Sequence, residues 1–203
     1  MKTLDPVLYK IRKESILQQA RHLFATRGYA ESSMDDIARA NHMQKASLYH
    51  YFTSKQQILQ EMIAWESERW ATRLRDVPLN LNFKDSLMHL AQAFLRNLDD
   101  TASREFFTII YFESSKNPAI FKAFKESPTY KQGGPIFEVM RTHLEKRLPR
   151  VKIAMLVTQF VGGLLHYARI SRLHGENMFL EPFSDEQYLE QCIGIFVRGV
   201  EGV

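Results

Sequence analysis

The stretch from Ser33 to Lys55, SMDDIARANHMQKASLYHYFTSK, constrains the fold more than any other part of the sequence. Ser33 offers a hydroxyl as the N-cap of a helix, and Asp36 follows three residues later in a carboxylate variant of the capping box. Asn41 and His42 tolerate a positive φ better than most residues other than glycine, so this helix is predicted to end there. A short helix that ends in a tight turn is the first half of a helix-turn-helix.

The second half of this unit is predicted to run from about Lys45 to Phe52. At about 100° per residue, Leu48 and Phe52 share one side and would anchor the helix to the core. A helix this short is weak alone, so packing must hold it. The opposite side carries small and hydrogen-bonding residues, which are Ala46, Ser47 and His50. Such a face suits the groove of a nucleic acid better than it suits water.

Longer helices are predicted on both sides of this unit. The first covers about residues 10–27 and ends at Gly28, while residues 1–9 carry no periodic pattern and are expected to form an arm. The second is predicted over Lys55–Val77, because Pro78 cannot continue it. This second helix links the unit to the rest of the chain.

The rest of the chain also has helical spacing. Helices are expected at residues 83–98, 104–112, 118–124, 136–144, 151–173 and 185–200, with a loop or kink at 128–135. Segment 104–112 is apolar nearly all round, which indicates an enclosed helix, and Phe121 and Phe124 are expected to face inward. In the last helix, Cys192 lies on an apolar stripe and is expected to be buried. No β-strand signal stands out, so the predicted fold class is all-α.

Composition limits the classes of protein that fit this sequence. The 203 residues are 45% hydrophobic, enough for a substantial core in one or two domains. No run of 18 or more apolar residues occurs, so no membrane span is predicted, and the N-terminus lacks the apolar region of a signal peptide. A single cysteine excludes an internal disulfide and fits a reducing cytoplasm.

The net positive charge lies in the N-terminal part of the chain. Residues 1–60 hold nine Lys/Arg against five Asp/Glu, whereas residues 61–203 hold eighteen of each. The formal charge of +4 therefore belongs to the first 60 residues. This bias favours a phosphate-binding surface, and a solvated basic face is the simpler alternative.

The sequence LFATRGYAESSMDD, followed by IARANHMQKASLYHYFTSKQQIL, resembles the N-terminal DNA-binding domain of the TetR family of bacterial transcriptional regulators. The matching order is LF, GY, S-M-D-D-I-A, LYHYF and SK, over roughly residues 10–62. The resemblance implies an all-helical homodimer with about nine helices per subunit. Residues 1–54 would form a three-helix DNA-binding domain, and residues 55–203 would form a ligand-binding and dimerisation domain. The last two helices would build a four-helix dimer bundle.

Three positions depart from the usual family pattern. His42 stands where the turn normally has glycine, Gln44 replaces a Ser/Thr cap, and Ala46 replaces a frequent glycine. Gln44 is a poorer N-cap, so the recognition helix is expected to fray until DNA orders it. The operator sequence is correspondingly harder to infer.

The resemblance also suggests which residues touch DNA. Lys45, Ser47 and His50 are the predicted base-edge contacts, because lysine can donate to guanine and Ser or His can serve several bases. The full predicted DNA-binding set is Ser33, Gln44, Lys45, Ala46, Ser47, Tyr49, His50, Tyr51 and Lys55. Tyr49, Tyr51 and Lys55 match positions that contact DNA phosphates in the family. Lys55→Ala is predicted to weaken binding to all sequences similarly and to lower the salt dependence of binding by about one charge. Ordinary packing of the two tyrosines and a solvated His50 are the alternatives.

The C-terminal part is rich in large aromatic residues that could line an effector pocket. The predicted effector-binding set is Phe107, Tyr111, Phe112, Phe121, Phe124, Phe137, Met140, Phe160 and His166. Their chemistry favours a hydrophobic or aromatic small molecule. Simple core packing is the alternative, because aromatic stripes at helical spacing usually pack cores.

These predictions combine into one function. The chain is predicted to be a cytoplasmic repressor that binds double-stranded operator DNA as a homodimer and is released when an effector shifts its conformational population. No metal spacing, P-loop or nucleophile motif occurs, so neither catalysis nor a metal or other cofactor is expected. The alternative is a helical small-molecule-binding or interaction protein without DNA-binding activity.

Overall fold

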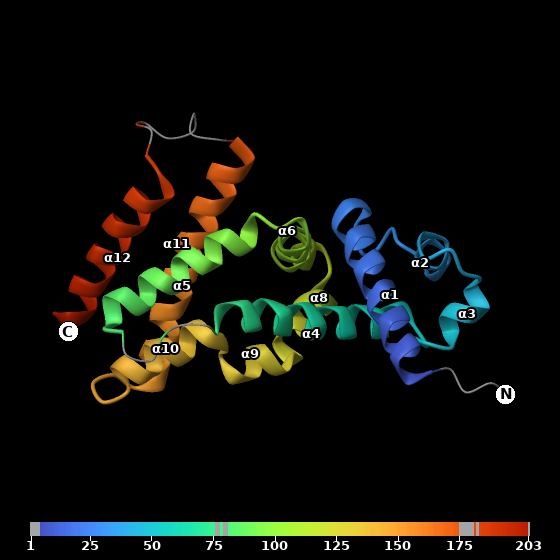
Figure 1. Ribbon diagram of the computed structural model, residues 1–203, viewed down its shortest axis with the longest axis horizontal. Coiled ribbons are helices and arrows are strands. Elements are labelled where there is room, and N and C mark those ends of the chain that lie inside the picture. Colours follow the sequence, from blue (N-terminus) through green and yellow to red (C-terminus); the bar gives the residue numbers. More distant parts are fainter. Residues whose placement is uncertain (1–4, 76–77, 79–80, 175–180, 182, 203) are drawn as a thin grey trace. The chain divides into compact units, whose positions relative to one another are not determined.

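The structure, a computed structural model, describes residues 5–75, 78, 81–174, 181 and 183–202. It is all-α, and no strand occurs within these ranges (Figure 1). The helices are α1 (Pro6–Arg27), α2 (Met34–Ala40), α3 (Lys45–Tyr49), α4 (Lys55–Leu74), α5 (Phe83–Leu98), α6 (Thr101–Thr108), the π-helical turn η1 (Ile109–Glu113), α7 (Ser114–Lys116), α8 (Pro118–Glu126), α9 (Pro128–Gln132), α10 (Gly134–Leu144), α11 (Arg150–His174) and α12 (Asp185–Glu201).

Helix α1 begins earlier than the apolar periodicity predicts. It starts at Pro6, because Asp5 is its N-cap and accepts a hydrogen bond from Val7 N at 2.8 Å. The predicted arm over residues 1–9 is therefore wrong for residues 6–9, and residues 1–4 lie outside the described residues. Likewise α3 ends at Tyr49 rather than Phe52, and the predicted end of α4 at Val77 lies outside the described residues.

The chain divides into two compact units. The first comprises Met1–Arg69 and Thr101–Gln132, and the second comprises Trp70–Asp100 and Gly133–Val203. The first unit thus joins the helix-turn-helix to α6–α9, which follow α5 in the sequence. The predicted boundary at residue 54 divides the chain by function rather than by compactness, and it stays a prediction.

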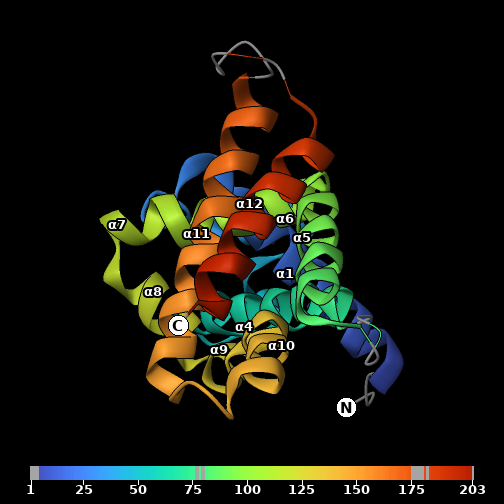
Figure 2. The same cartoon turned by 90° about the vertical axis from the view of Figure 1, so that its left-hand side faces the viewer.

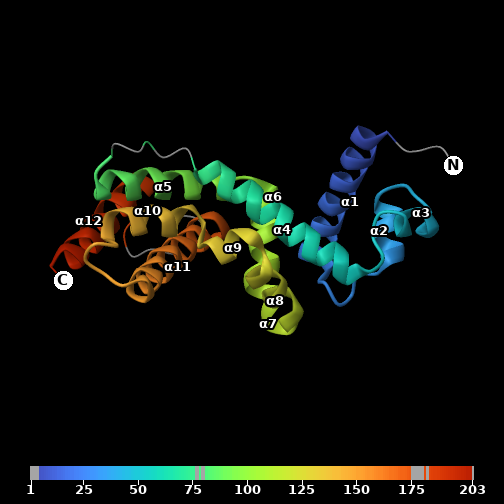
Figure 3. The same cartoon turned by 90° about the horizontal axis from the view of Figure 1, so that it is seen from below.

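In the first unit, α2 and α3 lie on the same side of α1 (Figures 1 and 3), and α1 also contacts α6. The core of this unit draws on α1, α2, α3, α4, α6, η1 and α8. Leu48 and Phe52 are fully buried in it, which confirms their predicted role as anchors of the second helix-turn-helix segment. Their burial holds a five-residue helix that would not be stable alone.

In the second unit, α5 packs against α10, α11 and α12 (Figure 2). Tyr167 of α11 stacks on Tyr188 of α12, with ring centroids 3.7 Å apart, and its hydroxyl donates to Asp185 Oδ1 at 2.6 Å. Arg172 binds both oxygens of the same carboxylate at 3.0 and 2.8 Å. These contacts fix the pairing of α11 with α12.

Helix α11 has a face that the described residues do not cover. Its segment Arg150–Arg172 contains an 18-residue window of mean hydropathy 1.3, of which 28% is buried, so length and composition alone would let it cross a membrane. It is the one such helix in the part of the chain that the structure describes. One such helix is a weak indication of a span, because soluble proteins also build long apolar helices.

Segment 104–126 is less enclosed than the sequence predicts. Tyr111, Phe112 and Phe121 are between 43% and 49% exposed, so the predictions of an enclosed helix at 104–112 and an inward Phe121 are wrong at these positions. The π-helical turn explains the first error, because its extra residue per turn rotates the side chains that follow it. Ile109 and Ile110 take the buried positions instead.

The buried face of α12 differs from the prediction by one position. Leu189, Ile193, Val197 and Val200 are buried, whereas Cys192 is exposed, so its predicted burial is wrong. In the predicted loop at 128–135, Pro128–Gln132 forms the short helix α9. Gly133 and Gly134 then take φ values of 90° and 72°, and these left-handed residues make the predicted kink.

Candidate nucleic-acid interface

The N-terminus of α2 has the predicted capping box. Ser33 Oγ accepts from Asp36 N at 3.1 Å, and Asp36 Oδ2 accepts from Ser33 N at 2.9 Å. Hydrogen bonds from the Ser33 hydroxyl and backbone N–H hold the pKa of Asp36 below its usual value. Arg39 also donates to this carboxylate, at 2.6 Å. The first turn of α2 is therefore capped, and the Asp36 carboxylate lies within it.

The turn between α2 and α3 is built without glycine. His42 has a φ of 52°, which confirms the predicted left-handed position, and no other residue apart from glycine has a positive φ in the described ranges. The buried Asn41 holds this turn, since its Nδ2 donates to Ile37 O at 2.9 Å and its Oδ1 accepts from Ser15 Oγ at 3.2 Å. The sequence interpretation did not assign Asn41 this role.

Helix α3 presents most of the predicted contact residues to solvent. Gln44 makes no side-chain capping bond, as expected of a poor cap. Gln44, Lys45, Ala46, Tyr49 and His50 are exposed, and Ser47 is half-buried. In the free protein, Lys45 Nζ pairs with Asp35 Oδ2 of α2 at 2.8 Å, and this hydrogen bond raises the pKa of Lys45. Lys45 is therefore paired within the helix-turn-helix in this structure.

Tyr51 is held by a residue that the sequence interpretation missed. The ring of Tyr9 stacks on Tyr51, with centroids 4.9 Å apart and planes inclined by 20°. Tyr9 lies in the first turns of α1, which the sequence interpretation assigned to an arm. The Asp5–Pro6 pair could have revealed this, because Asp is a preferred N-cap and Pro a preferred first helical residue.

Lys55 lies at the start of α4, and its amine is turned into the molecule. Nζ donates to the carbonyl oxygens of Tyr29 at 2.8 Å, Ala30 at 3.2 Å and Ser32 at 2.7 Å. It also lies 4.4 Å from the centroid of the Tyr29 ring. Burial lowers the pKa of Lys55, against a smaller opposite effect of Glu31. The three carbonyl oxygens occupy the amine in this structure. The predicted contact of Lys55 with a DNA phosphate stays a prediction.

A buried ionic cluster lies behind the interface, and we call Arg21, Glu66 and Glu105 the α1–α4–α6 cluster. Arg21 pairs with Glu66, and its Nε donates to Glu105 Oε2 at 2.9 Å. Burial disfavours the charge of Arg21, but hydrogen bonds to Glu105 and Glu66 outweigh it and raise the pKa. His22 Nδ1 also lies 2.6 Å from Glu105 Oε1. The cluster joins α1 to α4 and α6 through Arg21, a residue to which the sequence interpretation assigned no role.

The predicted effector residues are divided between the two units. In the first unit, Phe107 stacks on Tyr111 at 5.7 Å, and Phe121 and Phe124 lie 6.5 Å apart. Phe112 also belongs to the first unit and is exposed, whereas the other four belong to the second unit, where Phe137, Met140 and Phe160 are buried and His166 is exposed.

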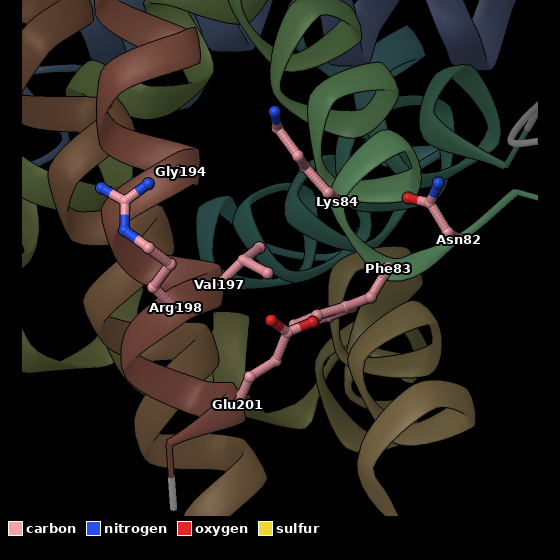
Figure 4. A pocket seen from close by; sticks show the side chains of 7 residues that line it. All are labelled: Asn82, Phe83, Lys84, Gly194, Val197, Arg198 and Glu201. Carbon is pink, nitrogen blue, oxygen red and sulfur yellow. The ribbon is translucent and has the colours of Figure 1, made fainter.

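Three pockets with described linings contain other residues. Figure 4 shows one of about 340 Å³, lined by Asn82, Phe83, Lys84, Gly194, Val197, Arg198 and Glu201. A second, of about 520 Å³, lies between α11 and α12 and is lined by Leu148, Lys152, Met155, Leu156, Gln159, Ile195, Phe196, Gly199 and Val200. A third borders the first turns of α1, at Pro6, Val7, Lys10, Ile11 and Glu14. None of the nine predicted effector residues lines these three pockets.

Comparison with known proteins finds similarity in the part of the chain that contains the candidate interface. Residues 16–62 match the model described as bacterial regulatory proteins, tetR family. The HTH-type transcriptional regulator UidR of Escherichia coli K12 is 26% identical over 110 residues, which cover 54% of this chain and 55% of UidR. The Staphylococcus aureus (strain Newman) regulator IcaR, described as a negative regulator of the biofilm operon icaADBC, is 39% identical over 51 residues, 25% of this chain and 27% of IcaR.

The match spans about half the length of UidR and a smaller share of IcaR. Among solved structures, Salmonella enterica GusR superposes with a TM-score of 0.73 at 21% identity and covers 99% of this chain and 100% of its own. This likeness extends the shared fold over the whole chain.

Proposed function

We propose that this chain, whose residues 16–62 match the model of the tetR family of bacterial regulatory proteins, is a transcriptional regulator of that family that binds operator DNA. It works in the cytoplasm as a homodimer, without a membrane partner. It is a repressor, as the description of IcaR as a negative regulator suggests. A small hydrophobic or aromatic effector releases it from DNA.

The observation that carries this proposal is the geometry of α2, the turn and α3. Leu48 and Phe52 are buried, while Lys45, Tyr49 and His50 of the same segment face solvent. A helix fixed on one side and exposed on the other can enter a major groove. Lys45, Ser47 and His50 read base edges, with Gln44 and Ala46 beside them. Ser33, Tyr49 and Tyr51 bind the phosphate backbone.

The uncovered face of α11 and α12 supports the homodimer. Val151, Met155 and Ile195 are between 55% and 65% exposed, next to the 520 Å³ pocket between the two helices. At Gly162 and Gly199 an added Cβ would meet nothing within 4 Å, so a second pair of helices can approach closely there. Two copies joined through these helices would set the spacing of their recognition helices to successive major grooves.

The effector site is proposed from the aromatic residues of the first unit. Phe107, Tyr111, Phe112, Phe121 and Phe124 form a partly exposed group, suited to an apolar or aromatic molecule. Phe137, Met140 and Phe160 are buried, which favours ordinary core packing for these three. A helical binding protein without DNA-binding activity is the competing function, and it would leave the exposed face of α3 unused.

A mobility-shift titration against the DNA upstream of its own gene tests the proposal. The protein is expected to shift this DNA at concentrations that leave a scrambled duplex free. Ser47→Ala and His50→Ala are each expected to change the ratio of affinities for two operator variants by roughly tenfold. One base contact contributes about 1–3 kcal/mol of discrimination between bases. Lys122→Ala, an exposed lysine of α8, is the control and should leave binding unchanged.

The competing function predicts a different result. If the upstream DNA and a pool of genomic fragments bind no better than the scrambled duplex, regulation through DNA is contradicted. A uniform loss across all operator variants for Ser47→Ala and His50→Ala would instead contradict their role in base reading.

A further inference from the structure

The ammonium of Lys55 has no hydrogen left for a DNA phosphate. A lysine ammonium carries three N–H donors, and here three carbonyl oxygens lie 2.7 to 3.2 Å from Nζ. The Tyr29 ring covers the same group at 4.4 Å. A phosphate could engage this amine only after at least one of these carbonyls had lost its donor.

The three carbonyls belong to one loop, Gly28–Ser33, which connects α1 to α2. Tyr29 is buried in this loop, with its ring edge-on to Phe24 at 5.1 Å. Ser32 is buried too, and its hydroxyl donates to Gly28 O at 2.8 Å. The loop ends at Ser33, the N-cap of α2. The position of this loop therefore sets the position of the first turn of α2.

A second side chain holds the same loop from η1. Glu113 Oε2 accepts a hydrogen bond from Tyr29 N at 3.3 Å, and its Oε1 pairs with Lys116 Nζ at 2.7 Å. Glu113 also limits the space at Gly28, where an added Cβ would lie 2.9 Å from Oε2. Gly28 has a φ of 93°, so a larger residue would be strained there for two reasons. Both contacts come from the π-helical turn.

We propose that Lys55 and Glu113 are positioning residues for DNA binding, which hold the Gly28–Ser33 loop from α4 and from η1. Lys55 then acts through the loop and the Ser33 cap, and it does not neutralise a phosphate. The part of this inference that concerns DNA rests on the proposed function. The part that concerns the contacts of Lys55 and Glu113 with the loop does not rest on it, because these contacts can be tested without DNA. Because Glu113 belongs to η1, η1 also supports α2 through the loop. A displacement of η1 would therefore move the DNA-binding surface.

The first experiment measures amide hydrogen exchange in the full-length protein without DNA. In Lys55→Met, the amides of Tyr29 and Asp36 are expected to exchange about tenfold faster or more, since hydrogen bonds to a charged group are lost. Lys122→Met is the matched control and should exchange as the wild type does. Glu113→Leu should speed exchange at Tyr29, whereas Glu113→Gln, which keeps an acceptor oxygen, should not. Unchanged exchange in both Lys55→Met and Glu113→Leu would overturn the proposal.

The second experiment measures operator affinity against salt concentration. A positioning role predicts that Lys55→Met binds more weakly with the same slope of log affinity against log salt. It also predicts that Lys55→Arg fails to restore affinity, because a planar guanidinium does not fit three carbonyls arranged around an ammonium. A phosphate contact predicts a slope lower by about 0.9 and rescue by arginine, and that result would overturn the proposal.

Two further outcomes are decisive. If Lys55→Met does not fold, the exchange comparison is made on Lys55→Arg, which keeps the charge and is still expected to loosen the loop. If the wild type binds no DNA at all, the proposed regulator function fails, and the exchange data alone decide whether Lys55 and Glu113 hold the loop.

Discussion

Asp36 shows how one carboxylate can fix the start of a recognition unit. It accepts hydrogen bonds from the backbone and hydroxyl of Ser33 and from Arg39, and Arg27 lies 3.7 Å away. These donors favour the charged form and depress the pKa. A group with a depressed folded-state pKa stabilises the fold above its unfolded-state pKa, and this stabilisation is lost as the pH falls through the folded-state value.

Replacing the cap tests this assignment. Ser33→Ala is expected to lower the free energy of unfolding by about 1 kcal/mol at neutral pH, the usual effect of losing an N-cap. The difference from the wild type should shrink as the pH falls below the ordinary pKa of an aspartate, about 3.9, and on through the depressed folded-state pKa of Asp36. Urea unfolding at pH 7 and pH 3 measures both values. Ser33→Thr keeps the hydroxyl and should retain most of the stability, whereas a pH-independent difference would contradict the role of Asp36.

Tyr9 offers a second test at the same scale. If its ring fixes the orientation of Tyr51, Tyr9→Ala should weaken binding to all operators alike, by roughly three- to tenfold, because a stacked pair contributes about 0.5–1.5 kcal/mol. Tyr9→Phe keeps the ring and should bind as the wild type does. Fluorescence anisotropy with several operators measures the effect, and unaltered affinity in Tyr9→Ala would exclude this role.

Among the elements, α1, α4 and α6 are joined by charge as well as by apolar packing. The α1–α4–α6 cluster contributes one guanidinium between two acidic side chains. Removing one partner of a buried ion pair lowers the free energy of unfolding more than replacing the whole pair with apolar residues does. The reason is that the remaining charge is buried without an opposite charge.

The cluster therefore predicts a large effect of a single substitution. Arg21→Met is expected to lower the free energy of unfolding by roughly 3–5 kcal/mol. Arg12→Met, at an exposed position of the same helix, is the control and should change it by less than about 0.5 kcal/mol. Chemical denaturation of both variants provides the comparison. Equal stabilities would show that the cluster contributes nothing.

The elements also show what a sequence can and cannot predict. The capping box of α2, the left-handed His42 and the buried Leu48 follow from local chemistry, and all three are confirmed. The exposure of Tyr111 was not predictable from apolar spacing, because an α-helical period was assumed and η1 has a longer one. The exposure of Cys192 was missed because apolar residues occupy adjacent faces of α12, and contacts with α5 select between them.

The same distinction holds for the candidate site. Local sequence indicated which α3 residues face outward, but it could not reveal that the carbonyls of Tyr29, Ala30 and Ser32 surround the Lys55 amine, whose phosphate contact stays a prediction. It missed Arg21 for a similar reason, since Glu105 is 84 positions away in the sequence. Long-range partners become visible only once the fold brings them together.

At the scale of the whole molecule, the proposed homodimer depends on the uncovered face of α11 and α12. Ile195→Asp is expected to convert the dimer to a monomer and to weaken operator binding at least tenfold, because a charge would be buried in an apolar interface. Analytical ultracentrifugation and a mobility shift measure the two effects. Lys146→Glu, at an exposed turn, is the control for added negative charge. A wild type that stays monomeric at micromolar concentration would contradict the dimer.

The exposed thiol of Cys192 gives this molecule a built-in attachment point. It is the single cysteine of the chain and lies three residues before Ile195 on α12. A maleimide or nitroxide reagent therefore modifies one defined position, without prior mutagenesis. Two nitroxides in the proposed dimer would give one inter-spin distance by pulsed resonance, and the same label on Ile195→Asp would give none. The subunit arrangement can thus be measured in solution on the otherwise natural protein.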